Sequence, residues 1–200
     1  AVAEAQRFPD RLELIARSDP WSIYRVLDAD LIEGLGYEPN VSKAGLTGGR
    51  SWTDPSTEWF NDPTRWDVLV ASDGPSRWNR VDVLNTGPTA RARFAPSLER
   101  PLAAVSVTGI VDEGERVSFS VDRVGIPVVV KTSYFPNWSV KGALGPYQAT
   151  PNWMIVVPTE NEVVLEYGAT WVEYLGWVIT VIGVGSLLVV AQRKRRKAHA

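Results

Sequence analysis

The feature that most constrains the fold of this chain is an uncharged run near its C-terminal end. No charged residue occurs from Tyr174 to Ala191, and the longer segment from Trp171 to Ala191 contains only Glu173. As a helix, the longer segment would be roughly 31 Å long, close to the thickness of the hydrocarbon core of a bilayer. We therefore predict a transmembrane helix over residues 171–192, with the lipid bilayer as a partner.

The residues that flank and interrupt this run predict its orientation and its neighbours. Aromatic residues typical of a membrane interface stand at its start: Trp171, Tyr174 and Trp177. Cations typical of the cytoplasmic side follow its end: Arg193, Lys194, Arg195, Arg196 and Lys197. Small residues within it predict contact with other transmembrane helices of a parent protein or complex: Gly176, Gly183, Gly185 and Ser186. The order of these flanking residues predicts a cell membrane, with residues 1–170 extracytoplasmic and residues 193–200 as a cytoplasmic tail.

The competing interpretation is a buried core helix followed by a basic tail that binds nucleic acid. The last ten residues hold five of the 21 Lys and Arg residues, which leaves 16 against 23 acidic residues in the first 190, a balance of −7. A body with this charge lacks the basic groove that neutralises phosphates, so we expect no nucleic-acid partner.

The residue types that are missing exclude several kinds of chemistry. The chain has no cysteine, and its single histidine is His199. A Ser-His-Asp triad, a thiolate nucleophile and a histidine zinc site are therefore excluded from the body. We expect no cofactor, no metal and no catalytic residue in this chain. Because it opens at Ala1 without a signal-peptide pattern, and its sole methionine is Met154, we expect a processed product or a piece of a larger protein.

The rest of the sequence indicates mainly β structure. Val117, Phe119 and Val121 alternate with polar residues, as on a half-buried strand, and the apolar run in "IPVVVKTSYF" suits a strand buried on both faces. Evenly spaced short strands predict an antiparallel, jelly-roll-like β-sandwich over residues 1–170, to which "WSIYRVLDADLIEG" also contributes. Residues 4–17 have a helical apolar spacing, and the proline-containing residues 85–100 are the candidate linker.

The stretch "DPSTEWFNDPTRWDVLVASDGPSRW" places a tryptophan after each of three turn signals. Its acids Asp54, Glu58 and Asp62 would share one face of a helix, where they could bind Ca²⁺ or act in acid–base chemistry. Because proline follows two of them, we favour two short turns capped by aspartate. The indoles are interpreted as buried, with the alternative that one of them stacks on a sugar: Trp59, Trp66 or Trp78.

The last third of the chain resembles the end of large bacterial multi-pass membrane proteins. The likeness lies in the motif Ser133-Tyr134-Phe135-Pro136-Asn137-Trp138, a hairpin that holds Gly142 and Gly145, the apolar strand Met154 to Val157, and a final span. These proteins are the YfhO-like and "6-pyruvoyl-tetrahydropterin synthase-related" membrane proteins, relatives of the GT-C type glycosyltransferases. The resemblance covers most of residues 20–190.

The resemblance implies a parent that transfers sugar from a polyprenyl-phosphate donor outside the cytoplasm. The acidic residue that serves as the catalytic base in that family precedes the part of the protein that this chain matches. No catalytic residue is therefore carried over. We therefore expect the C-terminal extracytoplasmic domain and last span of a glycosyltransferase-like protein, which helps to position an acceptor glycan in cell-envelope assembly. The alternative is a single-span anchored module that binds glycan or protein without catalysis.

Overall fold

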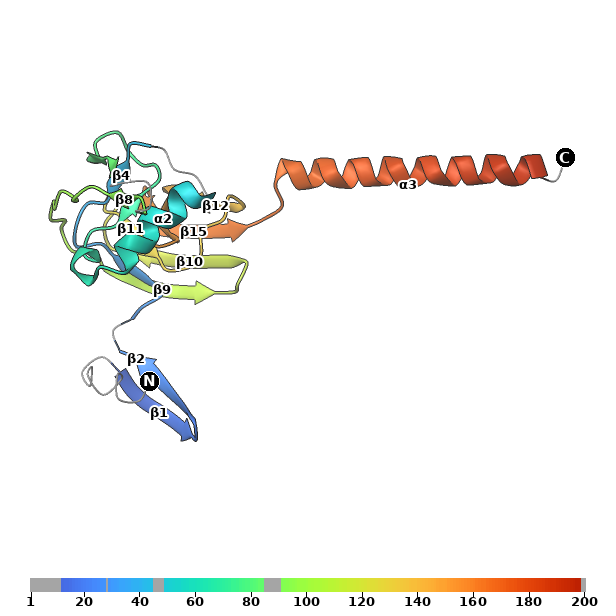
Figure 1. Cartoon of the computed structure of the whole chain (residues 1–200). Coiled ribbons are helices and arrows are strands. Elements are labelled where there is room, and N and C mark those ends of the chain that lie inside the picture. Colours follow the sequence, from blue (N-terminus) through green and yellow to red (C-terminus); the bar gives the residue numbers. More distant parts are fainter. Residues whose placement is uncertain (1–11, 28, 45–48, 85–90, 199–200) are drawn as a thin grey trace.

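The computed structural model describes residues 12–27, 29–44, 49–84 and 91–198, without the side chains of residues 49–50 and 188–198. The side chains of the predicted cytoplasmic anchor, Arg193 to Lys197, therefore lie outside the described residues, as do residues 85–90 of the candidate linker. The described chain is mainly β, as predicted, with a long helix at its C-terminal end (Figure 1).

The larger of the two main sheets has seven strands, in the spatial order β3-β11-β14-β13-β5-β4-β6. These strands are β3 (Ile32–Gly34), β4 (Asn40–Ser42), β5 (Val70–Ala71), β6 (Arg80–Val81), β11 (Val128–Val130), β13 (Ala143–Ala149) and β14 (Trp153–Pro158). Strand β4 runs parallel to both of its neighbours, whereas the other pairs are antiparallel. The prediction of a purely antiparallel sandwich is therefore wrong at β4, because a helix connects β4 to β5.

The smaller sheet has four antiparallel strands in the order β12-β15-β10-β9. They are β9 (Val107–Asp112), β10 (Arg116–Val121), β12 (Trp138–Lys141) and β15 (Glu162–Tyr167). The predicted alternation on β10 is confirmed, since Val117, Phe119 and Val121 are buried and the residues between them are not.

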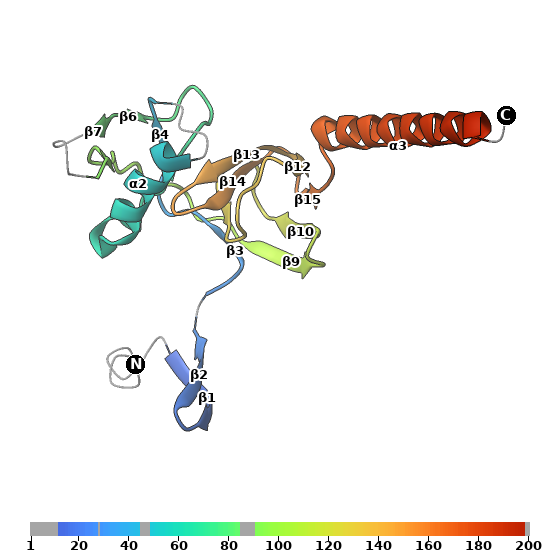
Figure 2. The same cartoon turned by 45° about the vertical axis from the view of Figure 1, so that its right-hand side comes forward.

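Alternating residues of the central strands build two cores on the two faces of the large sheet. Val128 and Val130 of β11 pack toward the small sheet, in a cluster with Phe119 and Leu165. Val129 points to the opposite face, in a cluster with residues of helix α2. This arrangement confirms the prediction of a strand buried on both faces. The domain thus has three layers: the small sheet, the large sheet, and α2 with its loops (Figure 2).

The stretch that carries the tryptophans forms one helix and one turn, where two capped turns were predicted. Helix α2 (Gly49–Phe60) includes Pro55 and takes in the first Asp-Pro pair, so Asp54 does not cap it. The second pair behaves as predicted: Asp62 caps the short 3-10 helix η1 (Pro63–Arg65), with proline at its first position.

Two further predictions fail near the N-terminus and at the candidate linker. Of residues 4–17, which have the helical spacing, 4–11 lie outside the described residues. The rest belong to β1 (Leu12–Ser18), which pairs with β2 (Trp21–Val26) in a hairpin that projects from the domain (Figures 1 and 2). Cross-strand pairing overrides the helical spacing there. After residue 90, the candidate linker forms β8 (Arg93–Phe94), which pairs with β7 (Val83–Leu84) and buries Phe94 in the domain.

Helix α3 (Trp171–Ala198) follows β15 and extends away from the domain (Figure 1). It is helical over the whole predicted span and continues into the basic tail, since Lys and Arg are good helix formers. Within the part of the chain that the structure describes, no helix is both long enough and apolar enough to cross a membrane. The prediction of a helix is confirmed, and its role as a membrane span is unsupported.

Candidate functional site

The structure separates the three predicted tryptophans into two core residues and one surface residue. Trp59 and Trp78 are each only 2% exposed, whereas Trp66 is 48% exposed. The interpretation of buried indoles is therefore confirmed for Trp59 and Trp78. Among the three tryptophans, only Trp66 has a ring that is exposed to solvent.

The two buried indoles hold α2 and its neighbouring loop on the large sheet. Trp59 donates a hydrogen bond from Nε1 to the carbonyl oxygen of Val68 at 3.2 Å. Trp78 packs edge-on against Tyr147 of β13, with a ring-centroid distance of 5.8 Å. The chain passes Trp78 so closely at Gly74 that any Cβ there would overlap the indole. Their apolar area stabilises the fold and is not available to a sugar.

Trp66 forms an exposed aromatic platform with Phe60, the last residue of α2. Their ring centroids lie 5.8 Å apart and their planes differ by 27°, a stacked geometry, and Phe60 is 52% exposed. Trp66 also donates from Nε1 to the carbonyl oxygen of Phe60 at 3.0 Å. We call these two residues the aromatic platform. Phe60 was missed in the sequence, although it follows buried Trp59 on a helix and must therefore point in a different direction.

The turn between the two rings is fixed by Asp62. Its Oδ1 accepts hydrogen bonds from the backbone N–H of Thr64 at 3.2 Å and from the Thr64 hydroxyl at 2.6 Å. The bond from the Thr64 hydroxyl lowers the pKa of Asp62 below its ordinary value. The cap thus stays ionised at neutral pH and holds Trp66 at a constant place beside Phe60.

A hollow of about 570 Å³ opens on the Phe60 side of the platform. We call it the α2 pocket, and its lining residues are Trp52, Thr53, Ser56, Thr57, Phe60, Gln148, Pro151 and Asn152. None of these side chains is charged. The indole of Trp52 is anchored by a bond from Nε1 to the carbonyl oxygen of Pro151 at 3.3 Å. Aromatic surface combined with hydroxyl and amide groups is the composition that binds neutral polar ligands.

A smaller hollow of about 220 Å³ lies on the Trp66 side. Its lining includes the aromatic residues Tyr37 and Trp153 as well as the acids Glu33 and Asp67. The platform therefore stands between two hollows of different charge. Three aromatic side chains line this second hollow when Trp66 is counted, so it offers further stacking surface for an extended ligand.

A third hollow, of about 360 Å³, has several charged side chains in its lining, and two of them already serve the fold. Arg65 donates to the carbonyl oxygens of Phe94 and Ala95, each at 3.1 Å, and burial lowers its pKa from the ordinary value. Asp62, on the same wall, is the cap of η1. The bonds of Arg65 tie residues 94–95 to η1.

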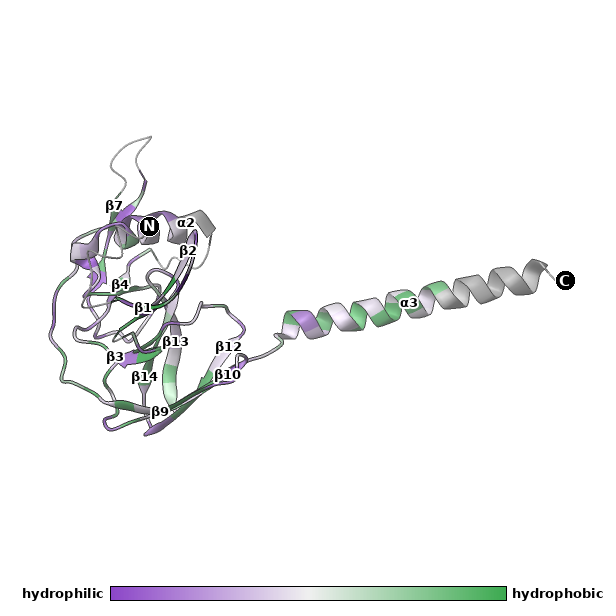
Figure 3. Ribbon diagram, turned by 90° about the horizontal axis from the view of Figure 1, so that it is seen from below, coloured by the Kyte–Doolittle hydropathy of each residue, from purple (hydrophilic) through white to green (hydrophobic). Residues whose placement is uncertain are grey.

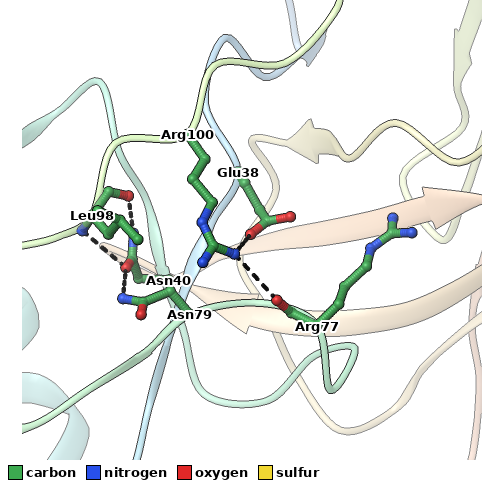
Figure 4. Close-up of polar contacts among 6 residues, drawn as sticks. All are labelled: Glu38, Asn40, Arg77, Asn79, Leu98 and Arg100. Carbon is green, nitrogen blue, oxygen red and sulfur yellow. Dashed lines mark hydrogen bonds and ion pairs between the residues drawn. The ribbon is translucent and has the colours of Figure 1, made fainter.

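The segment after β8 is fastened to the domain by a buried asparagine (Figure 4). Asn40 is fully buried, donates from Nδ2 to the carbonyl oxygen of Leu98 at 3.0 Å, and accepts from the Leu98 N–H at 3.1 Å. Its Oδ1 also accepts from the amide of Asn79. Arg100 pairs with Glu38 at 3.1 Å nearby. Asn40 therefore has a structural role.

Asp54, Glu58 and Asp62, which could have formed a metal or catalytic site, do not converge on one site. Asp54 lies within α2, Glu58 pairs with Arg91 at 3.8 Å, and Asp62 is a cap. Over the described residues, no group of three or more His, Cys, Asp or Glu side chains is placed to hold a metal ion.

The predicted membrane-interface residues lie on the first turns of α3, where all three are exposed: Trp171, Tyr174 and Trp177. The helix start is joined to the domain by Asn137, whose Nδ2 donates to the carbonyl oxygen of Gly168 at 3.0 Å and to Glu173 at 3.1 Å. Glu173 in turn accepts from the backbone N–H of Thr170, as in a capping box.

Comparisons of this chain with protein-family models, with curated proteins and with solved structures found no match. Its functional assignment therefore depends on the site geometry and on the sequence features described above.

Proposed function

We propose that this chain is the extracytoplasmic C-terminal domain and last membrane span of a glycosyltransferase-like integral membrane protein. In this proposal the β domain binds an acceptor glycan and positions it during cell-envelope assembly. In this proposal the chain itself performs no chemical step: Asp62 serves as a cap, Glu58 pairs with Arg91, and the one histidine is His199.

The observation that carries the proposal is the aromatic platform between two hollows. A sugar ring presents a face of C–H groups that packs on an aromatic ring, while its hydroxyl groups need polar partners at the edges. Phe60 and Trp66 supply exposed rings whose orientation is fixed by the turn at Asp62. The hollows on either side supply polar groups, so a glycan of several units could lie across the platform.

The proposal of membrane attachment starts from the exposed side chains of α3. From Trp177 to Leu187 its large apolar side chains are all at least half exposed. Hydrophobic residues recur along this part of the helix (Figure 3). A helix that is apolar all round requires an apolar environment. The charge-free run continues in the sequence to Ala191, beyond the last described side chain, and is followed by five cations.

The junction at Asn137 supports the positioning role. Asn137 belongs to the motif "SYFPNW", and its side chain bonds both the strand end at Gly168 and Glu173 on the helix. A domain attached in this way has a restricted orientation relative to the helix. A restricted orientation would place the aromatic platform at a defined distance from the membrane.

The test is glycan binding by the full 200-residue chain, measured by calorimetry in a detergent without a sugar head group. We expect the wild type to bind neutral oligosaccharides and Trp66→Ala to bind them about tenfold more weakly, because one stacking contact is lost. Trp21→Ala is the matched control, since Trp21 is 76% exposed on the β1–β2 hairpin, away from the platform. Equal loss in both variants, or none in Trp66→Ala, would contradict the platform.

Membrane attachment is tested separately on the native protein. An antibody against the "RKRRK" tail should detect, in washed bacterial membranes, a product several times larger than 22.1 kDa. A membrane band near 22 kDa would instead favour the anchored binding module, and a band released by an alkaline wash would contradict the span.

A further inference from the structure

We infer that the α2 pocket is a subsite for a neutral sugar unit, in which Ser56 and Gln148 bind a ring hydroxyl group. This inference rests on the proposed glycan binding. It specifies where one sugar unit binds and that this unit is uncharged. It begins from two oxygens that the fold buries without satisfying them.

The oxygens are Ser56 Oγ on α2 and Gln148 Oε1 on β13. Both side chains are more than nine-tenths buried, at 3% and 5% exposed, and within the described structure neither oxygen has a hydrogen-bond partner. Buried polar atoms in native proteins almost always have partners, because an unsatisfied one lowers stability. Two such atoms from different elements line the same hollow.

The remaining contacts define which ligand groups these two oxygens can bind. Gln148 donates from Nε2 to Asn152 Oδ1 at 2.9 Å, which leaves its Oε1 as a free acceptor. The hydroxyl of Ser56 can donate or accept. A sugar hydroxyl group matches this pair, since its O–H can donate to Gln148 while its oxygen accepts from Ser56. Because the two oxygens are covered from bulk solvent, its entry requires a small shift of the side chains above them.

The lining of the pocket selects against charged ligands. No acid or base lines it, whereas Glu33 and Asp67 line the hollow on the other side of the platform. A carboxylate or phosphate group in the α2 pocket would lose hydration without meeting a counter-charge. Trp52 and Phe60 provide the apolar wall that a ring face requires. The bound unit is therefore an uncharged sugar.

The effect of removing its hydroxyl group distinguishes a ligand-binding serine from a structural one. Ser56→Ala removes an unsatisfied group, so we expect an unchanged or higher Tm together with weaker binding. Ser42→Ala is the matched control, since Ser42 is also 3% exposed but its Oγ accepts a bond from the Ala44 N–H. That variant should show a lower Tm and unchanged affinity.

The experiment measures Tm and calorimetric affinity for the full chain in a detergent without a sugar head group. The neutral probes are maltohexaose, cellohexaose and mannohexaose, and the acidic probe is hexagalacturonate. We expect at least one neutral probe to bind, Ser56→Ala to bind it about fivefold to tenfold more weakly, and the acidic probe to bind at least tenfold more weakly than the neutral one.

The outcomes separate this inference from the proposed function. Weaker binding by Trp66→Ala with no change in Ser56→Ala would overturn the subsite and leave glycan binding in place. Equal or tighter binding of hexagalacturonate would overturn the selection for neutral units. A lower Tm in Ser56→Ala with unchanged affinity would show a structural serine. Failure of the wild type to bind any probe would overturn both proposals.

Discussion

Strand β14 and the described first half of helix α3 are both largely apolar, yet β14 is almost entirely buried and this part of α3 is exposed. Met154, Ile155 and Val156 of β14 are inaccessible to solvent, because the small sheet covers one face and α2 covers the other. Ile179, Val181 and Ile182 of α3 are each at least 60% exposed, in a helix that projects from the domain (Figure 1).

The comparison shows that an apolar run must be shielded from water. The run itself does not specify which elements shield it. Strand β14 is covered by elements of the same chain, since the small sheet packs on one of its faces and α2 on the other. For α3 the described chain supplies no comparable cover. Its apolar surface can be satisfied by lipid or by other helices. Three pairs of measurements would sharpen or break this comparison.

The largest expected effect is that of truncating matched isoleucines in the two runs. Ile155→Ala should lower the free energy of unfolding of the β domain by about 3 kcal/mol, since it leaves a cavity between the large sheet and α2. Ile179→Ala should change it by less than about 0.5 kcal/mol, because its side chain touches solvent. Urea unfolding followed by near-ultraviolet circular dichroism measures both. Similar losses in the two variants would mean that α3 packs on the domain.

A matched pair of glycines gives the second comparison. Gly142, between β12 and β13, has a positive φ of 75°, and a Cβ there would overlap the carbonyl oxygen of Glu162. Gly142→Ala should therefore destabilise the domain by about 2 kcal/mol. In α3, a Cβ at Gly183 would meet nothing within 4 Å.

Gly183→Ala should leave the domain unchanged and raise the helicity of α3, because alanine is the better helix former. Thermal unfolding reports the first variant, and far-ultraviolet circular dichroism of the full chain reports the second. A lower Tm in Gly183→Ala would reveal a close neighbour of α3.

The smallest effect concerns the ion pairs on β15, the strand that leads into α3. Glu166 pairs with Lys141 at 2.7 Å and with Arg116 at 3.1 Å, and the bond from Lys141 lowers the pKa of Glu166. The pKa of Glu166 is lower in the folded protein than in the unfolded chain. The ion pairs therefore stabilise the fold fully above the ordinary glutamate pKa of about 4.3, and this stabilisation is lost as the pH falls through the pKa of the folded state.

The difference in Tm between wild type and Glu166→Gln should therefore be constant above about pH 5 and should shrink below pH 4. In a background with Lys141→Met and Arg116→Met, the change in Tm caused by Glu166→Gln should not depend on pH in this way. A constant difference from pH 3 to pH 7 in the wild-type background would contradict the role of these pairs.

The sequence predicted those parts of the fold that depend on local pattern. The period-two alternation gave β10, the valine run gave a strand buried on both faces, and the Asp62-Pro63 pair gave a capped turn. The charge-free run gave a helix at 171. Local pattern failed at β1, where residues with helical spacing pair with β2, and at Asp54, which lies inside α2.

The candidate site was predicted only in part. Trp66 was one of three named indoles, and nothing in the spacing of Trp59, Trp66 and Trp78 distinguishes the exposed one. Phe60 follows from the helical period once α2 is known. Ser56 and Gln148 could not have been found, because they come from elements far apart in the sequence and are recognised only by their missing partners.

By itself, the sequence determined the β character of the domain, the helix at its end, the charge of the two parts and the absence of cysteine and histidine chemistry from the body. These properties follow from composition and from periods of two or 3.6 residues, which act over a few neighbours. Tertiary structure alone decided which tryptophan faces solvent, that β4 lies parallel to its neighbours, and that two polar oxygens are buried unpaired. Burial and hydrogen bonding depend on contacts such as that of Trp52 with Pro151, which join residues far apart in the chain.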